Sequence, residues 1–191
     1  CESMKARCAR REWPRDPAAG MSGPADRIDV FPMPAWAHVP GETRGADHAR
    51  LAPVKALVPA RFDRVVPWQN SALRYGLALN DAGFFWECHE ILEAVWAAAP
   101  QGGRDRILLR ACIQIANANL KRRMRRGQAA ARLEAEALAG LDELAVRGPA
   151  GAGEGFADRI STEKLAGILR QTGGRSVATS WQPGLLLPVL K

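Results

Sequence analysis

The most regular pattern of hydrophobic and polar positions lies in residues 84–96, FFWECHEILEAVW. Their apolar side chains form one continuous arc when the segment is drawn as an α-helix of 3.6 residues per turn. His89 and Glu93 lie beside that arc, one turn apart, with Trp86 and Trp96 on either side. A polar pair between two indole rings is expected to be buried, and buried polar groups need hydrogen-bonding partners. The pair is therefore the first place to look for a functional site.

The same helical spacing recurs along the chain, and no segment alternates as a strand would. Asn80-Asp81-Ala82-Gly83 predicts a turn that ends a first helix, and Gly127 predicts the end of a long, almost wholly apolar helix. The predicted helices are about 71–80, 84–99, 105–126, 128–146 and 161–171, the last with Ser161 as its cap. The fold class is therefore all-α, a compact bundle of four to five helices.

The first 66 residues are rich in Pro, Arg, Ala and Gly and have no sustained period. Residues 1–30 are predicted to be a disordered leader, with Met21 as a candidate start of the natural chain. An extended N-terminal arm follows and forms one helical domain with the bundle, residues 31–147. Residues 148–191 add a linker, the fifth helix and an irregular tail. The arm's apolar residues available to dock on the bundle are Phe31, Trp36, Leu51, Val54 and Leu57.

Composition adds little to this picture. The net charge of +7 is spread along the chain, apart from the basic run 121–126 at a predicted helix end, where cations are favoured. Aromatic residues do not alternate with these arginines, so nucleic-acid binding is disfavoured. No apolar run is long enough to cross a membrane. The four cysteines include no C-x-x-C pair, which favours a reducing, cytoplasmic location.

One interpretation of the polar pair is a divalent metal site. His89 and Glu93 are close enough on one helix face to share an ion, and Glu90 stands where H-E-x-x-H metalloproteases keep their general base. Two ligands from one helix do not hold an ion such as zinc, so a third is needed. His48 in the arm is the candidate, and a hydrolase is the reaction class that this set suggests.

A second interpretation is a metal-free site for a small molecule. His89, Glu90 and Glu93 would then be the catalytic or binding groups, and Trp86 and Trp96 would form the pocket walls. The helix 105–126 has a single polar stripe that can face this pocket, and its members there are Gln114, Asn117 and Lys121.

A third interpretation is structural. The His–Glu cluster would be a satisfied polar network in the core, which fixes how the helices meet and has no substrate. The chain would then act as a scaffold or as a protein-interaction module, and an interaction module is expected to self-associate. The residues alone leave the three interpretations open, and with them whether the chain is an enzyme.

The combined motifs resemble the family known as domain of unknown function 309. Its pattern is a glycine, an aromatic pair, H-E-x-x-E-x-x-W, I-Q-x-A on a long helix, and a glycine before an alanine-rich helix. The matching residues are Gly83, Phe85-Trp86, His89-Glu90, Glu93, Trp96, Ile113-Gln114-Ile115-Ala116, Gly127 and Ala129-Ala130-Ala131. The resemblance covers about residues 34–145 and implies a compact helical fold of bacterial, archaeal and plastid-type proteins without an established activity. Relatives often have His-Pro just after a V-P-G-x-T segment. In this chain the segment is Val39-Pro40-Gly41-Glu42-Thr43, and Arg44-Gly45-Ala46-Asp47 separate it from His48.

Overall fold

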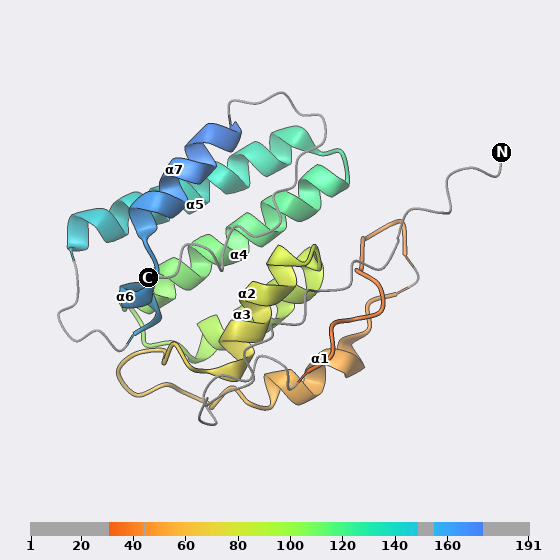
Figure 1. Cartoon of the computed structure of the whole chain (residues 1–191), viewed down its shortest axis with the longest axis horizontal. Helices are drawn as coiled ribbons and strands as arrows, with labels where there is room; N and C mark the ends of the chain where they lie inside the picture. Colours follow the sequence, from red (N-terminus) through yellow and green to blue (C-terminus); the bar gives the residue numbers. More distant parts are fainter. Residues whose placement is uncertain (1–30, 44, 149–154, 174–191) are drawn as a thin grey trace, which may run out of the picture.

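The computed structural model describes residues 31–43, 45–148 and 155–173 (Figure 1). These residues form helices and connecting loops without a strand, which confirms the all-α prediction. Seven helices are present in the described part, because two short ones add to the predicted five. They are α1 (His48–Lys55), α2 (Ser71–Asp81), α3 (Phe85–Ala98), α4 (Arg104–Arg123), α5 (Gly127–Arg147), α6 (Phe156–Arg159) and α7 (Thr162–Gly173).

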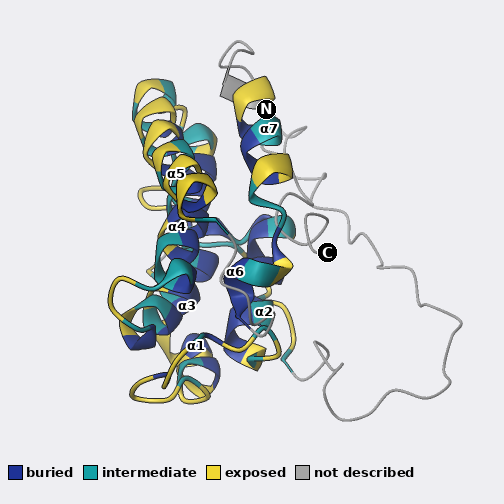
Figure 2. Ribbon diagram, turned by 90° about the vertical axis from the view of Figure 1, so that its left-hand side faces the viewer, coloured by how far each residue is buried: buried dark blue, intermediate teal, exposed yellow. Residues whose placement is uncertain are grey.

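Helix α4 runs through the middle of the bundle, as its nearly all-round apolar sequence predicts. It lies between α5 and the α2–α3 pair, α7 packs on α5, and α1 contacts the outer side of α3 (Figure 1). Residues from all seven helices contribute to one hydrophobic core, including Leu51, Leu92, Ile115 and Leu141. Exposed residues mark the outer face of α5 (Figure 2).

The arm is not extended throughout, because residues 48–55 form α1. Asp47 caps this helix by accepting a hydrogen bond from the N–H of Arg50 (3.3 Å). Pro53 lies inside this helix, beyond the first turn, where proline normally kinks or breaks a helix. Leu51 and Val54 turn into the core and dock the arm, whereas Trp36 and Leu57 remain 50% and 45% exposed.

The long helix predicted to end at residue 126, just before Gly127, ends three residues earlier. Helix α4 ends at Arg123, and Arg125 takes the left-handed conformation (φ 57°) that commonly terminates helices. Gly127 instead begins α5, so residues 124–126 connect the two long helices, where the sequence predicted Gly127 alone.

The C-terminal helices join the same core. Asp105 of α4 accepts hydrogen bonds from the N–H of Val66 (2.6 Å) and from the N–H of Ala157 (2.8 Å). Ser161 caps α7 through the N–H of Lys164 (3.4 Å), as predicted. The predicted leader 1–30 with Met21, most of the linker and the tail after residue 173 lie outside the described residues. In the described part, no helix is both long and apolar enough to cross a membrane.

Candidate functional site: a histidine and two glutamates on α3

Helix α3 divides into an inner and an outer face. Its inner face is filled by Phe85, Cys88, Ile91, Leu92 and Val95, each at most 2% exposed. Fixing this face in the core determines which side chains point outward. The outward set includes Trp86, His89, Glu90 and Glu93, the residues that the sequence singled out.

Three of these outward side chains meet at one place. His89 Nε2 lies 3.0 Å from Glu93 Oε1, and His89 Nδ1 lies 3.9 Å from Glu90 Oε1. One ligand atom from each residue can be chosen so that all three atoms lie within 4.8 Å of one another. That spacing is compatible with a shared metal ion, whose bonds to nitrogen and oxygen ligands measure about 2.0–2.2 Å.

The expectation that His89 and Glu93 are both buried is wrong for the carboxylate. The His89 side chain is 21% exposed, but the Glu93 side chain is 53% exposed. On the helical wheel, Glu93 lies about 130° from the centre of the apolar arc, against about 90° for His89. The cluster is thus at the protein surface, where ions and small molecules can reach it.

Glu90 is the member of the cluster that another helix covers. Its Oε2 accepts a hydrogen bond from Lys55 Nζ at 2.8 Å, and His48 Nδ1 lies 3.7 Å from the same oxygen. Both basic residues belong to α1, and the Glu90 side chain is only 17% exposed. Helix α1 therefore brings His48, the predicted third ligand, to the edge of the cluster.

The two tryptophans have different surroundings. Trp86 packs edge-on against the rings of His38 and His48, each with centroids 4.9 Å away. Trp96 lies instead under the guanidinium of Arg106, 3.8 Å from the ring centroid, and Arg106 also donates to the carbonyl oxygen of Trp96. Trp86 thus borders the cluster together with α1, whereas Trp96 packs against α4.

The polar stripe of α4 does not supply the pocket wall that the small-ligand interpretation needs. Gln114 donates a hydrogen bond to Glu136 of α5, at the exposed side of the bundle. Asn117 and Lys121 are half-buried members of the same narrow stripe. Because the contact of Gln114 is with α5, the stripe borders α5 and solvent.

Sequence reasoning missed a buried carboxylate, Glu87. This residue is 5% exposed, and its Oε1 accepts a hydrogen bond from the N–H of His38 (2.7 Å). Its Oε2 is buried without a hydrogen-bond partner among the described residues. Burial raises the pKa of Glu87 above its ordinary value, although the hydrogen bond from His38 and the charge of Arg123 act in the opposite direction. Glu87 therefore anchors the arm on α3.

Glu87 makes stability depend on pH. Because its pKa is raised on folding, the folded protein retains a proton that the unfolded chain loses at pH values just above 4.5. The contribution of Glu87 to the free energy of unfolding therefore falls as the pH rises from the ordinary glutamate pKa to the raised pKa of the folded protein. Glu87→Gln should flatten the slope of stability against pH in urea denaturation, while Glu163→Gln, at an exposed position, should leave it unchanged. Equal slopes for Glu87→Gln and the natural sequence would contradict this assignment.

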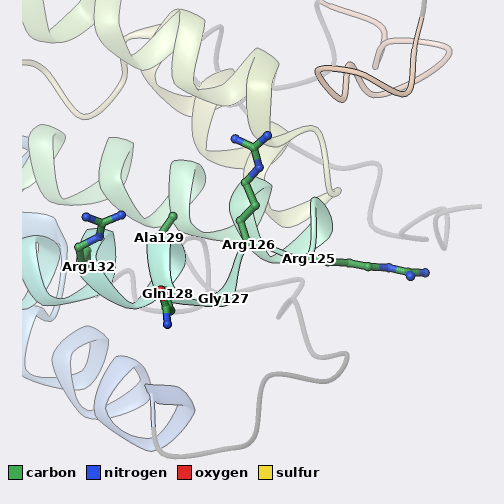
Figure 3. Close-up of a pocket in the computed structure, with 6 residues that line it drawn as sticks. All are labelled: Arg125, Arg126, Gly127, Gln128, Ala129 and Arg132. Carbon is green, nitrogen blue, oxygen red and sulfur yellow. The ribbon is translucent and has the colours of Figure 1, made fainter.

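The basic run 121–126 is partly used inside the fold. Arg122 forms an ion pair with the buried Glu134 of α5, and Arg123 donates to the carbonyl oxygen of Gly83 (3.5 Å). Beyond it, the start of α5 borders a hollow of about 330 Å³. Figure 3 shows that Arg125 and Arg126 point in different directions there, so they do not converge on one anion.

The described residues thus form an all-helical fold with a histidine–glutamate cluster on α3. Residues 73–133 match the family model described as "Domain of unknown function (DUF309)", which confirms the resemblance noted in the sequence. The match runs from α2 into α5 and includes His89, Glu90 and Glu93, but not His48 or Lys55 of α1. Comparisons with curated proteins and with solved structures gave no match.

Proposed function

We propose that this protein binds a divalent transition metal ion through His89, Glu90 and Glu93, with His48 completing the site from α1. The observation that supports this most strongly is the convergence of one imidazole and two carboxylates on a single surface position. Imidazole suits zinc and iron, whereas carboxylates also suit manganese, so the ligand set favours Zn²⁺, Fe²⁺ or Mn²⁺ over Mg²⁺ or Ca²⁺.

Two features favour metal binding over a purely structural network. A structural network is expected to be buried and fully hydrogen-bonded, but the Glu93 side chain is 53% exposed. In addition, His89 Nδ1 is a buried atom without a hydrogen-bond partner among the described residues. A buried polar atom without a partner, beside an exposed carboxylate, is more typical of a site that takes up an ion or water than of a closed core network.

The arrangement also suits hydrolytic chemistry. A zinc ion held by His89, Glu90 and Glu93 would keep its fourth position for water and would lower the pKa of that water towards neutrality. With His48 as a fourth ligand, an octahedral ion such as Mn²⁺ would still keep positions for water. Because Glu93 is exposed, a small-molecule substrate can approach the ion from solvent. The catalytic roles of His89, Glu90 and Glu93 therefore depend on the ion in this proposal, and Trp86 forms the apolar border of the site.

The proposal extends to the cellular location, which is the cytoplasm, and to the partners of the protein. Cys88 and Cys112 are free and buried, which fits a reducing cytoplasm. The arginines beside α5 point in different directions and do not form one phosphate-binding site, so nucleic acid is not the partner that we propose. Self-association stays a prediction of the interaction alternative, for which Met33 and Trp36 provide exposed apolar surface.

Calorimetric titration of the full chain with ZnCl₂ and with MnCl₂ tests the proposal. The natural sequence should bind one ion, and His89→Ala or Glu93→Gln should weaken binding by at least about 100-fold. Loss of outer-shell partners alone costs about 10–100-fold, so loss of a ligand should cost more. His48→Ala should cost about tenfold, because the His48 side chain is 65% exposed and more loosely placed.

Two matched controls separate ligand loss from general effects. His38→Ala removes an imidazole whose Nδ1 is hydrogen-bonded to Thr43, and Glu163→Gln removes a carboxylate from α7. Both variants should bind the ion as the natural sequence does. Equal binding by His89→Ala and the natural sequence would refute the metal site. So would a failure of both the natural sequence and Lys55→Met, which frees Glu90 from its ion pair, to bind either ion.

A further inference from the structure

Lys55 occupies the position of a counter-ion at the candidate metal site. Its Nζ lies 2.8 Å from Glu90 Oε2, and the two side chains are 34% and 17% exposed. An ion pair that is shielded from water to this extent is screened less than a pair on an open surface. The ammonium therefore neutralises a carboxylate that the metal site needs.

The charges at the site do not accommodate both cations equally well. With both imidazoles neutral, the form that binds metals, Glu90, Glu93 and Lys55 sum to a net charge of −1. Adding a divalent ion changes this sum to +1 while Lys55 stays, and to zero once its ammonium has left. Two cations a few ångströms apart repel each other, and the repulsion grows as water is excluded.

The structure also offers a way for Lys55 to leave. Its side chain is partly exposed at the end of α1, so the flexible stem can turn its ammonium into solvent. Leu51 and Val54 stay in the core and hold α1 in place meanwhile. His48, at the other end of the same helix, can then remain beside Glu90.

We propose that Lys55 is a tethered competitor of the metal ion: its ammonium holds Glu90 until a divalent cation displaces it. This inference rests on the metal site proposed above. It adds that an ion must bind Glu90 more strongly than the Lys55 ammonium does. Only a cation that gains more from Glu90 than the ammonium does will bind, which excludes weakly bound divalent ions such as Mg²⁺ and favours the transition metals.

The test is a titration of full-length Lys55→Met and Lys55→Arg with ZnCl₂ and MnCl₂. Lys55→Met retains the apolar stem but removes the charge, so its Kd should fall by about tenfold relative to the natural sequence. Lys55→Arg keeps the charge, so its Kd should stay within about threefold. Circular dichroism of all three proteins verifies that the total helix content is unchanged by the substitutions.

The outcomes distinguish this inference from the proposal on which it depends. If the natural sequence binds zinc, His89→Ala does not, and Lys55→Met binds no more tightly than Lys55→Arg, then Lys55 is only a strut and the competition is refuted. If neither the natural sequence nor Lys55→Met binds zinc or manganese, the metal site itself is refuted. If Lys55→Met alone binds with measurable affinity, both the site and the competition are supported.

Discussion

Asp105→Ala is expected to lower the free energy of unfolding by about 2–5 kcal/mol, a large part of the stability of a domain of this size. Asp105 is 6% exposed, and its two carboxylate oxygens accept hydrogen bonds from the N–H groups of Val66 and Ala157. Alanine would leave both buried donors without a partner, each costing about 1–3 kcal/mol. The space is also tight, because a Cβ on Gly155 would lie 3.0 Å from Asp105 Oδ1.

Urea denaturation followed by circular dichroism measures this effect. Asp63→Ala removes a carboxylate from an exposed loop position and should change stability by less than about 0.5 kcal/mol. Asp105→Asn keeps one acceptor oxygen and should fall between the two. Similar stabilities for Asp105→Ala and Asp63→Ala would show that the hydrogen bonds from Asp105 to Val66 and Ala157 contribute little.

Gly76→Val is expected to destabilise the protein by about 3 kcal/mol, because α2 and α3 touch at this position. A Cβ there would lie 2.7 Å from Leu92 Cδ2 and 3.2 Å from Ile91 Cγ2. Leu92 and Ile91 are fully buried, so neither has free space into which it can move. Any shift of α3 would also move His89 and Glu93, which this helix positions.

Gly167→Ala on α7 is the matched control, since nothing lies within 4 Å of its added Cβ. Alanine is the better helix former, so this variant should gain about 0.5–1 kcal/mol. Opposite signs at the two helical glycines are the expected result of the same urea experiment. A stabilising Gly76→Val would mean that the helices can separate without cost.

The long helices could be predicted from sequence because their apolar positions repeat with the period of the helix itself. Helix α1 could not, for two reasons. Its eight residues span only about two turns, and Pro53 within them indicates a break rather than a helix. Its stability comes from Leu51 and Val54 packing in the core, a tertiary contact that no local pattern reveals.

Missing α1 also left the environment of Glu90 unpredicted. Glu90 lies about 170° from the centre of the apolar arc and, on an isolated helix, would be the most exposed of the three cluster residues. Helix α1 covers it through Lys55 and His48, whereas Glu93 has no such cover and stays exposed. A wheel describes one helix without its neighbours, so it identified the cluster but not its environment.

Glu87 had a signal in the sequence that could have been used. It lies about 40° from Ile91 on the wheel, at the edge of the apolar arc opposite His89. That position predicts partial burial, but its hydrogen bond with the N–H of His38 depends on the path of the arm. The direction of Gln114 likewise depends on how α4 is rotated between α3 and α5, which periodicity does not determine.

Anomalous diffraction at the zinc edge, from crystals grown with ZnCl₂, would locate the proposed ion directly. We expect one strong peak about 2.0–2.2 Å from a ring nitrogen of His89 and from carboxylate oxygens of Glu93 and Glu90. Lys55 Nζ should have left Glu90 in the same map. A crystal in which His89 and Glu93 keep their 3.0 Å contact, with no anomalous peak beside them, would contradict the assignment of this cluster as a metal site.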